Sequence, residues 1–145
     1  MNDGGQKFEQ LDVGQALDEL TLEPNEVQLF MFSAVTWDTH RTHFDTPYSV
    51  DKESLPGILV HGHLQGSFLS KYVSDWAGVD GRLRSLNYQN RGMVIPGERL
   101  TLRGKLTGKS REDETCVVTM QVWLEKDGGE ISTTGEATVE IPYGQ

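Results

Sequence analysis

Residues 62–76, GHLQGSFLSKYVSDW, carry the pattern on which the predicted fold depends. Apolar residues recur here at intervals of three and four, the period of a helix with one buried face. They are Leu64, Phe68, Leu69, Tyr72, Val73 and Trp76. The start of this helix has small residues at Gly62, Gly66 and Ser67. Another backbone or a ligand can therefore approach it closely.

Three later segments alternate between apolar and polar residues, as half-buried strands do. They are residues 98–106, 115–124 and 131–141, whereas residues 82–94 have a mixed pattern. Asp127-Gly128-Gly129 predicts a hairpin between the last two. A helical first half followed by an antiparallel meander indicates an α+β domain with a helix covering one sheet face. The exposed edges of such a sheet often continue across a dimer interface, so we expect an oligomer.

A second helix is predicted upstream, where Asn25 is a candidate N-cap and Gln28 stands three residues later. Its expected buried face consists of Val27, Phe30, Met31, Ala34 and Val35. The helix should end near Trp37. Residues 38–60 are polar and rich in turn formers, and loops of this length are often functional.

The bulk properties indicate one folded domain. With 145 residues, we expect a single domain over residues 1–145, with residues 1–12 as a loose lead-in. The net charge of −9 disfavours nucleic-acid partners, which are polyanions. Cys116 is the sole cysteine, so no intrachain disulfide is possible, and a reducing compartment is favoured. Because neither a signal-peptide pattern nor a membrane-spanning run is seen, we expect a cytoplasmic protein without membrane partners.

All four histidines of the chain fall within residues 40–63. They are His40, His43, His61 and His63, and the carboxylic acids Asp38 and Asp45 belong to the same region. The two halves of this cluster flank the long loop. Reversal of the chain across that loop would bring them together.

These groups suit the addition of water to a double bond conjugated with a thioester. Imidazole titrates near neutral pH and can deprotonate the water, a role that His43 could fill. A partly buried carboxyl can supply the proton for the α-carbon, because burial raises the pKa of carboxyl groups, and Asp38 is the candidate. Gly62 begins the apolar helix, where a backbone N–H can stabilise the enolate-like carbonyl oxygen.

The same residues resemble a known family. Residues 38–45, DTHRTHFD, resemble the D-x-N-P-x-H-x-D segment of MaoC-like dehydratases and (R)-specific enoyl-CoA hydratases. Residues 57–62, GILVHG, resemble the family's G-x-x-x-H-G stretch, and residues 75–78 and 94–101 are similar as well. The resemblance extends from about Val13 to Ile141.

This resemblance implies a hot-dog fold, in which an antiparallel sheet wraps around a central helix. It also implies 2-enoyl and 3-hydroxyacyl thioesters of coenzyme A or an acyl carrier as substrates. It further implies an Asp38/His43 dyad acting on one water, with the Gly62 N–H on the thioester carbonyl and Ser70 near it. No cofactor or metal is implied. Members normally form homodimers or higher homo-oligomers, and heteromers also occur. The length matches members with one hot-dog domain.

One departure from the family pattern concerns the substrate. His40 and Arg41 stand where the family usually has Asn-Pro, next to the acyl chain. The substrate-binding candidates are therefore His40, Arg41, His61 and Ser70. For His61, ordering the loop or capping the helix is the simpler role. Arg82, Arg84, Arg91 and Arg103 are candidates for a positive coenzyme A entrance, although solvated strand positions explain them more simply.

Three alternatives remain open from the residues. The four imidazoles and nearby carboxylates suggest a metal site, although neither helical i,i+4 spacing nor a cysteine ligand supports it. A non-catalytic, thioester-binding subunit of a hot-dog heteromer would account for the altered Asn-Pro position. A hot-dog thioesterase would need a carboxylate on the central helix, where only Asp75 is present, at the far end.

Overall fold

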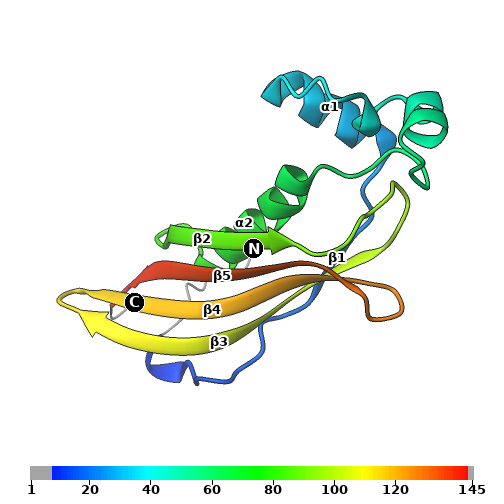
Figure 1. Ribbon diagram of the computed structural model, residues 1–145. Helices are drawn as coiled ribbons and strands as arrows, with labels where there is room; N and C mark the ends of the chain where they lie inside the picture. Colours follow the sequence, from blue (N-terminus) through cyan, green and yellow to red (C-terminus); the bar gives the residue numbers. More distant parts are fainter. Residues whose placement is uncertain (1–7, 144–145) are drawn as a thin grey trace.

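The computed structural model describes residues 8–143, which form a curved antiparallel sheet with one long helix along a face (Figure 1). The sheet has five strands in the order β1-β3-β4-β5-β2. The strands are β1 (Leu20–Leu22), β2 (Arg82–Asn90), β3 (Leu100–Glu112), β4 (Thr115–Lys126) and β5 (Ile131–Pro142). Two α-helices, α1 (Glu26–Thr36) and α2 (Gly62–Ala77), complete the domain, together with three short helical turns, η1 (Phe8–Gln10), η2 (Arg41–His43) and η3 (Tyr48–Lys52).

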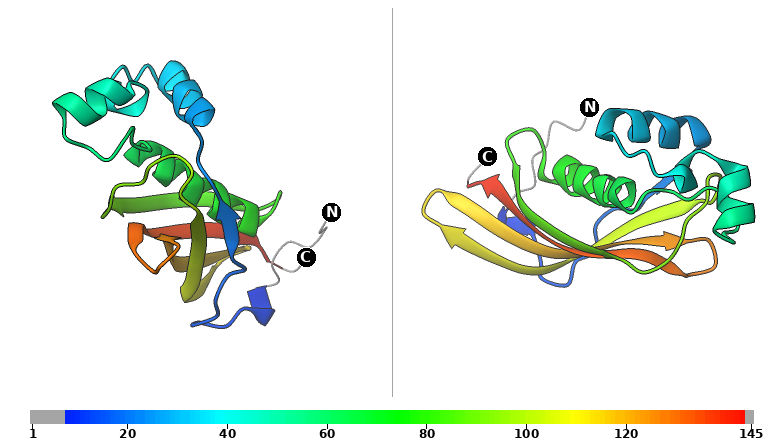
Figure 2. Two further views of the ribbon diagram at one scale, coloured as in Figure 1. Left: turned by 90° about the vertical axis from the view of Figure 1, so that its right-hand side faces the viewer. Right: turned by 45° about the horizontal axis from the view of Figure 1, so that its top comes forward.

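Helix α2 lies along the inner face of the sheet, as both views in Figure 2 show. Its predicted apolar side packs into the core. Leu64, Leu69, Tyr72 and Val73 are buried, whereas Phe68 and Trp76 are partly buried against the same cluster. The predicted helix and its buried face are therefore confirmed. A helix held by a wrapped antiparallel sheet is the hot-dog arrangement expected from the sequence.

Strands β3, β4 and β5 form the predicted meander, and residues 127–129 turn the last hairpin. The other two strands join by long-range pairing. Strand β2 follows α2 in the chain but pairs with β5 at one edge. The short strand β1 pairs with β3 at the other edge. The core lies between α2 and the inner faces of the three long strands.

Helix α1 has the predicted ends but not the predicted buried face. The Asn25 side chain accepts a hydrogen bond from the Gln28 N–H (2.9 Å), and Trp37 closes the helix in the left-handed conformation with φ 57°. The buried residues are Leu29 and Ser33. The expected core residues Val27, Phe30, Met31 and Val35 are between 55% and 76% exposed, so that prediction was wrong. The physical reason is that α1 stands away from the sheet (Figure 2), so that only Leu29 and Ser33 of this helix are buried.

The expected lead-in at residues 1–12 is described only from residue 8 onward, because residues 1–7 lie outside the described range. Residues 8–10 form the turn η1, and the Leu11 side chain is 2% exposed. Among the described residues, no helix is long and apolar enough to cross a membrane.

Candidate active site

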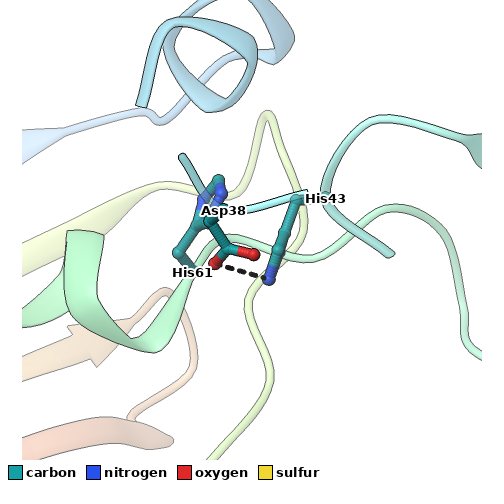
Figure 3. A group of neighbouring side chains, drawn as sticks. All are labelled: Asp38, His43 and His61. Carbon is teal, nitrogen blue, oxygen red and sulfur yellow. Dashed lines mark ion pairs between the residues drawn. The ribbon is translucent and has the colours of Figure 1, made fainter. Parts of the chain in front are cut away.

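The position of Asp38 is determined by the end of α1. The backbone N–H groups of Trp37 and Asp38 both donate to the Ser33 carbonyl, which turns the chain sharply after the helix. The Asp38 Oδ1 atom accepts a hydrogen bond from the His40 N–H (3.1 Å). The other carboxylate oxygen, Oδ2, stays available on the side that faces His43 (Figure 3).

His43 ends the turn η2, and its ring orientation follows from one hydrogen bond. Its Nδ1 lies 2.7 Å from the Leu59 carbonyl oxygen. Because a carbonyl only accepts, Nδ1 carries the hydrogen and the neutral ring has its lone pair on Nε2. The Leu59 N–H in turn donates to the Thr42 carbonyl (2.8 Å). This pair of bonds joins the loop at residues 41–43 to the segment before α2.

The side-chain atoms of His43 and Asp38 that make no hydrogen bond within the described residues face one another. The distance between His43 Nε2 and Asp38 Oδ2 is 3.8 Å, which is too long for a direct hydrogen bond (Figure 3). Both atoms therefore retain bonding capacity directed at the same small space. A single water can bond to both of them. The structure thus brings together the two residues predicted to be the dyad.

His61 forms the back wall of this site. Its ring stacks on the His43 ring with centroids 3.7 Å apart and an angle of 19° between the planes. The side chain is 1% exposed, and its Nε2 lies 2.8 Å from the Ser33 hydroxyl. Burial, followed by the charge of His43, lowers the pKa of His61 to about 4. His61 is therefore uncharged at neutral pH.

This buried imidazole should make the stability of the protein depend on pH. In the folded chain His61 resists protonation down to about pH 4, whereas a free histidine protonates near 6.5, so the unfolded chain binds more protons in that window. Stability is fully present above pH 6.5 and is lost as the pH falls. The expected loss from this residue between pH 7 and pH 4 is about 3 kcal/mol.

The measurement is the free energy of urea unfolding at several pH values, for the natural chain and for His61→Gln. Glutamine cannot titrate, so the natural chain should lose more stability than the variant by about that amount. Parallel pH curves for the two proteins would contradict the neutral, buried state of His61.

The start of α2 leaves its first N–H groups open. His61 occupies the N-cap position, but its side chain makes no capping hydrogen bond, so the predicted capping role is wrong. Within the described residues, the N–H groups of Gly62, His63 and Leu64 have no acceptor. A Cβ on Gly62 would collide with the Asn90 side-chain amide, which lies against this turn. An uncapped helix N-terminus next to the dyad is suited to a developing negative charge.

The same three side chains are the best candidate for the metal alternative. Asp38, His43 and His61 each offer one ligand atom within 4.8 Å of the others. Imidazole binds a metal along the lone pair in the plane of its ring. Because the two rings are stacked nearly parallel, their lone pairs run side by side and do not converge on one ion at ligand distance. The geometry therefore suits proton transfer better than metal binding.

The structure places the predicted substrate-binding residues at different distances from this chemistry. The His40 ring lies edge-on to His43 with centroids 5.8 Å apart and is exposed, and its Nδ1 is 2.7 Å from the Thr42 hydroxyl. Arg41 is held by Asp45 through hydrogen bonds of 2.9 and 2.6 Å from Nε and Nη2. Ser70 is half-buried on α2, about two turns beyond the helix start.

Other polar residues of the region have structural roles. Asp45 accepts a hydrogen bond from the Tyr48 N–H (3.0 Å), so it orders the loop by binding a backbone group. That bond, followed by the bond from Arg41, lowers the pKa of Asp45. His63 is exposed, and its Nδ1 lies 2.8 Å from the Tyr88 hydroxyl.

Most of the arginines considered for a coenzyme A entrance form ion pairs with glutamates. Arg82 and Arg84 pair with Glu140, and Arg103 pairs with Glu19. These contacts agree with the simpler interpretation as surface strand positions. Arg91 lines a cavity of about 580 Å³ along β2, β4 and β5. Neither Asp38 nor His43 lines that cavity.

Three residues of the site were not predicted from the sequence. They are Ser33, which holds His61, Leu59, whose carbonyl orients His43, and Asn90, which covers Gly62. Leu59 acts through its backbone, so its side chain gives no signal. Ser33 carried a weak signal, because it is the one polar residue in the run LFMFSAV at residues 29–35 and stands four residues after Leu29.

Comparisons with known proteins agree with this fold. The (R)-hydratase from A. caviae involved in PHA biosynthesis is 25% identical and superposes with a TM-score of 0.81, covering 92% of this chain and 98% of that one. In the ChsH1-ChsH2 complex from Mycobacterium tuberculosis, one chain is 22% identical with a TM-score of 0.78, covering 90% of this chain and 98% of that one. At this identity the second likeness shows the fold alone.

A third relative matches over a shorter stretch. The mesaconyl-C(4)-CoA hydratase of Chloroflexus aurantiacus is 48% identical over 44 residues, which is 30% of this chain and 16% of that protein. Fold and comparisons together define the class of MaoC-like hot-dog hydratases and dehydratases. Within that class, the chain belongs to the hydroxyacyl-thioester dehydratase type 2 family, whose model matches residues 6–96.

Proposed function

We propose that this protein interconverts 2-enoyl and 3-hydroxyacyl thioesters, with Asp38 and His43 as its acid/base pair. The observation that carries the proposal is the gap of 3.8 Å between His43 Nε2 and Asp38 Oδ2, beside the uncapped start of α2. Membership in a family of hydroxyacyl-thioester dehydratases supports the reaction type. The name of the Chloroflexus relative supports a coenzyme A thioester as substrate.

In the hydration direction, His43 Nε2 removes a proton from the water, and the water oxygen forms a bond to the β-carbon of the enoyl group. The π electrons move toward the thioester carbonyl, whose oxygen accepts a hydrogen bond from the Gly62 N–H. Asp38 then delivers a proton to the α-carbon. Over one hydration His43 gains the proton of the water and Asp38 loses one, so a proton has to pass from His43 back to Asp38, and the next water in the gap can relay it. Dehydration runs through the same steps in reverse.

The test is a spectrophotometric assay on a panel of enoyl-CoA esters of different lengths. The expected result is loss of the enoyl absorbance without release of free thiol. Thiol release with an intact enoyl group would indicate a thioesterase. Asp75, the carboxylate considered for that reaction, pairs with Lys71 (2.7 Å) on the outer surface of α2. Binding of esters without any turnover would favour a non-catalytic subunit.

We further propose that the active protein is a homodimer or higher oligomer. The apolar side of α1, with Val27, Phe30, Met31 and Val35 exposed, supports this, because monomers rarely expose contiguous apolar patches of this kind. The ChsH1-ChsH2 neighbour is a complex of two proteins, so a heteromer is the second candidate. Sedimentation analysis of the purified chain distinguishes an oligomer from a monomer that needs a partner.

A further inference from the structure

His61 contacts the proposed base but takes no part in the proton transfers described above. This histidine is 1% exposed, and its buried Nδ1 has no hydrogen-bond partner among residues 8–143, an arrangement that is costly to fold. An apolar side chain in its place would avoid that cost. The site therefore contains a polar group that neither the reaction nor the packing of the core accounts for.

Ser33 connects this histidine to the acid of the pair. Its hydroxyl lies 2.8 Å from His61 Nε2. Its carbonyl accepts hydrogen bonds from the N–H groups of Trp37 and Asp38, with 3.0 Å to the second. Ser33 itself is 8% exposed. One buried residue on α1 thus anchors both Asp38 and the ring behind His43.

The stacked contact restricts how the His43 ring can turn. In the part of the chain that the structure describes, the His43 ring makes one hydrogen bond, from Nδ1 to the Leu59 carbonyl, and torsions that end in an aromatic ring are otherwise broad. With the His61 ring lying flat against it at 3.7 Å, rotation of the His43 ring about that torsion would drive its edge into His61. Phe32 supports His61 in turn, with centroids 4.8 Å apart.

We propose that His61, anchored by Ser33, is a positioning residue that holds the ring of His43 with Nδ1–H on Leu59 and the lone pair of Nε2 toward Asp38. The effect on turnover rests on the proposed hydration reaction. The ring orientation itself does not, and it can be measured in the absence of any substrate.

The charge state of His61 fits this role. The charged and titratable groups that act on it are His43, Asp38 and His63, and burial is the largest influence on its pKa. When His43 takes up a proton from water, a positive charge develops 3.7 Å from the centre of the His61 ring. An uncharged ring accepts this neighbour through its π face, whereas a second cation would repel it.

Two variants test separately the stacking of the His61 ring on His43 and the hydrogen bond between His61 and Ser33. His61→Gln removes the ring and leaves a side chain that can still bond to Ser33. The double variant Ser33→Ala with His61→Phe keeps an aromatic face and removes the hydrogen bond and the unpaired nitrogen. For His61→Gln we expect kcat to fall by about 10²-fold with little change in KM, because misplacement of a catalytic group by about 1 Å has an effect of that size. The double variant should lose less kcat than His61→Gln does, because it keeps a flat aromatic ring against His43.

The second readout is the nitrogen NMR spectrum of His43 at a pH where its ring is neutral. In the natural chain and the double variant, Nδ1 should appear protonated and Nε2 unprotonated. In His61→Gln the two signals should move toward each other as the two tautomers mix. Unchanged signals in His61→Gln, or mixing in the double variant alone, would overturn the positioning role. If the natural chain shows the ordered signals but no hydration, the proposed function fails while this inference stands.

Discussion

Replacement of His43 by alanine is expected to lower kcat for enoyl-thioester hydration by roughly 10²- to 10⁴-fold, the usual contribution of a positioned general base. Asp38→Asn should cause a loss of the same order, because the amide cannot deliver a proton to the α-carbon. The affinity for the thioester should change little in either variant, because neither side chain is the proposed contact to the carbonyl. Steady-state hydration kinetics with ester binding measured in parallel test these expectations.

The chain offers matched controls for both residues. His63 is an exposed histidine on the first turn of α2, and Asp51 is an exposed acid in η3. His63→Ala and Asp51→Asn should retain activity within a few-fold of the natural chain. Full activity of His43→Ala or Asp38→Asn would refute the dyad. Equal losses in the control variants would indicate general damage to the loop.

Gly62→Pro combined with Asn90→Ala is expected to lower kcat/KM by about 10²- to 10³-fold, the cost of removing one donor from an oxyanion site. Proline deletes the backbone N–H that is proposed to bind the thioester carbonyl. The first position of a helix tolerates proline well, and His61, at φ −55° and ψ 138°, already has the conformation that a residue before proline prefers. The Asn90 change makes room for the new ring.

The matched control is Gly62→Ala combined with Asn90→Ala. It adds a Cβ at the same place and keeps the N–H, so its kcat/KM should stay within a few-fold of that of Asn90→Ala alone. Circular dichroism and thermal unfolding should be similar for the two double variants. If both lose activity equally, the N–H of Gly62 is not the donor and steric effects account for the loss.

The elements of the fold that have a strong hydrophobic period were predictable. Helix α2 and the meander of β3, β4 and β5 lie where the periods of 3.6 and 2 indicated, because each has one face in the core. The same argument gave the wrong buried face for α1. An apolar stripe on a helix shows that some partner should cover it, but a single sequence does not show that the sheet stops short of it. The pairing of β2 with β5 was not predictable either, since it depends on long-range closure of the chain.

In the candidate site too, some of the arrangement could be predicted from the sequence and some could not. Asp38 and His43 are close in the sequence, so their approach followed from spacing and from the motif. The stacking of His61 on His43 joins residues on opposite sides of a long loop, and it depends on the bonds between Thr42, His43 and Leu59. Each of these bonds uses a backbone atom of Leu59, so the side chain of Leu59 gives no sign of them in the sequence.

Asp38 and His43 lie on the loop that follows α1. This location has a consequence for how the sequence around them can change. The loop that follows α1 carries His40 and Arg41 on its surface, outside the core formed by α2 and the sheet. Substitutions at exposed positions of this kind usually change stability by less than about 0.5 kcal/mol. The exposed positions of this loop can therefore change with less effect on folding than positions in the core can. His40 and Arg41, which stand where the motif that this sequence resembles has Asn-Pro, occupy positions of this kind.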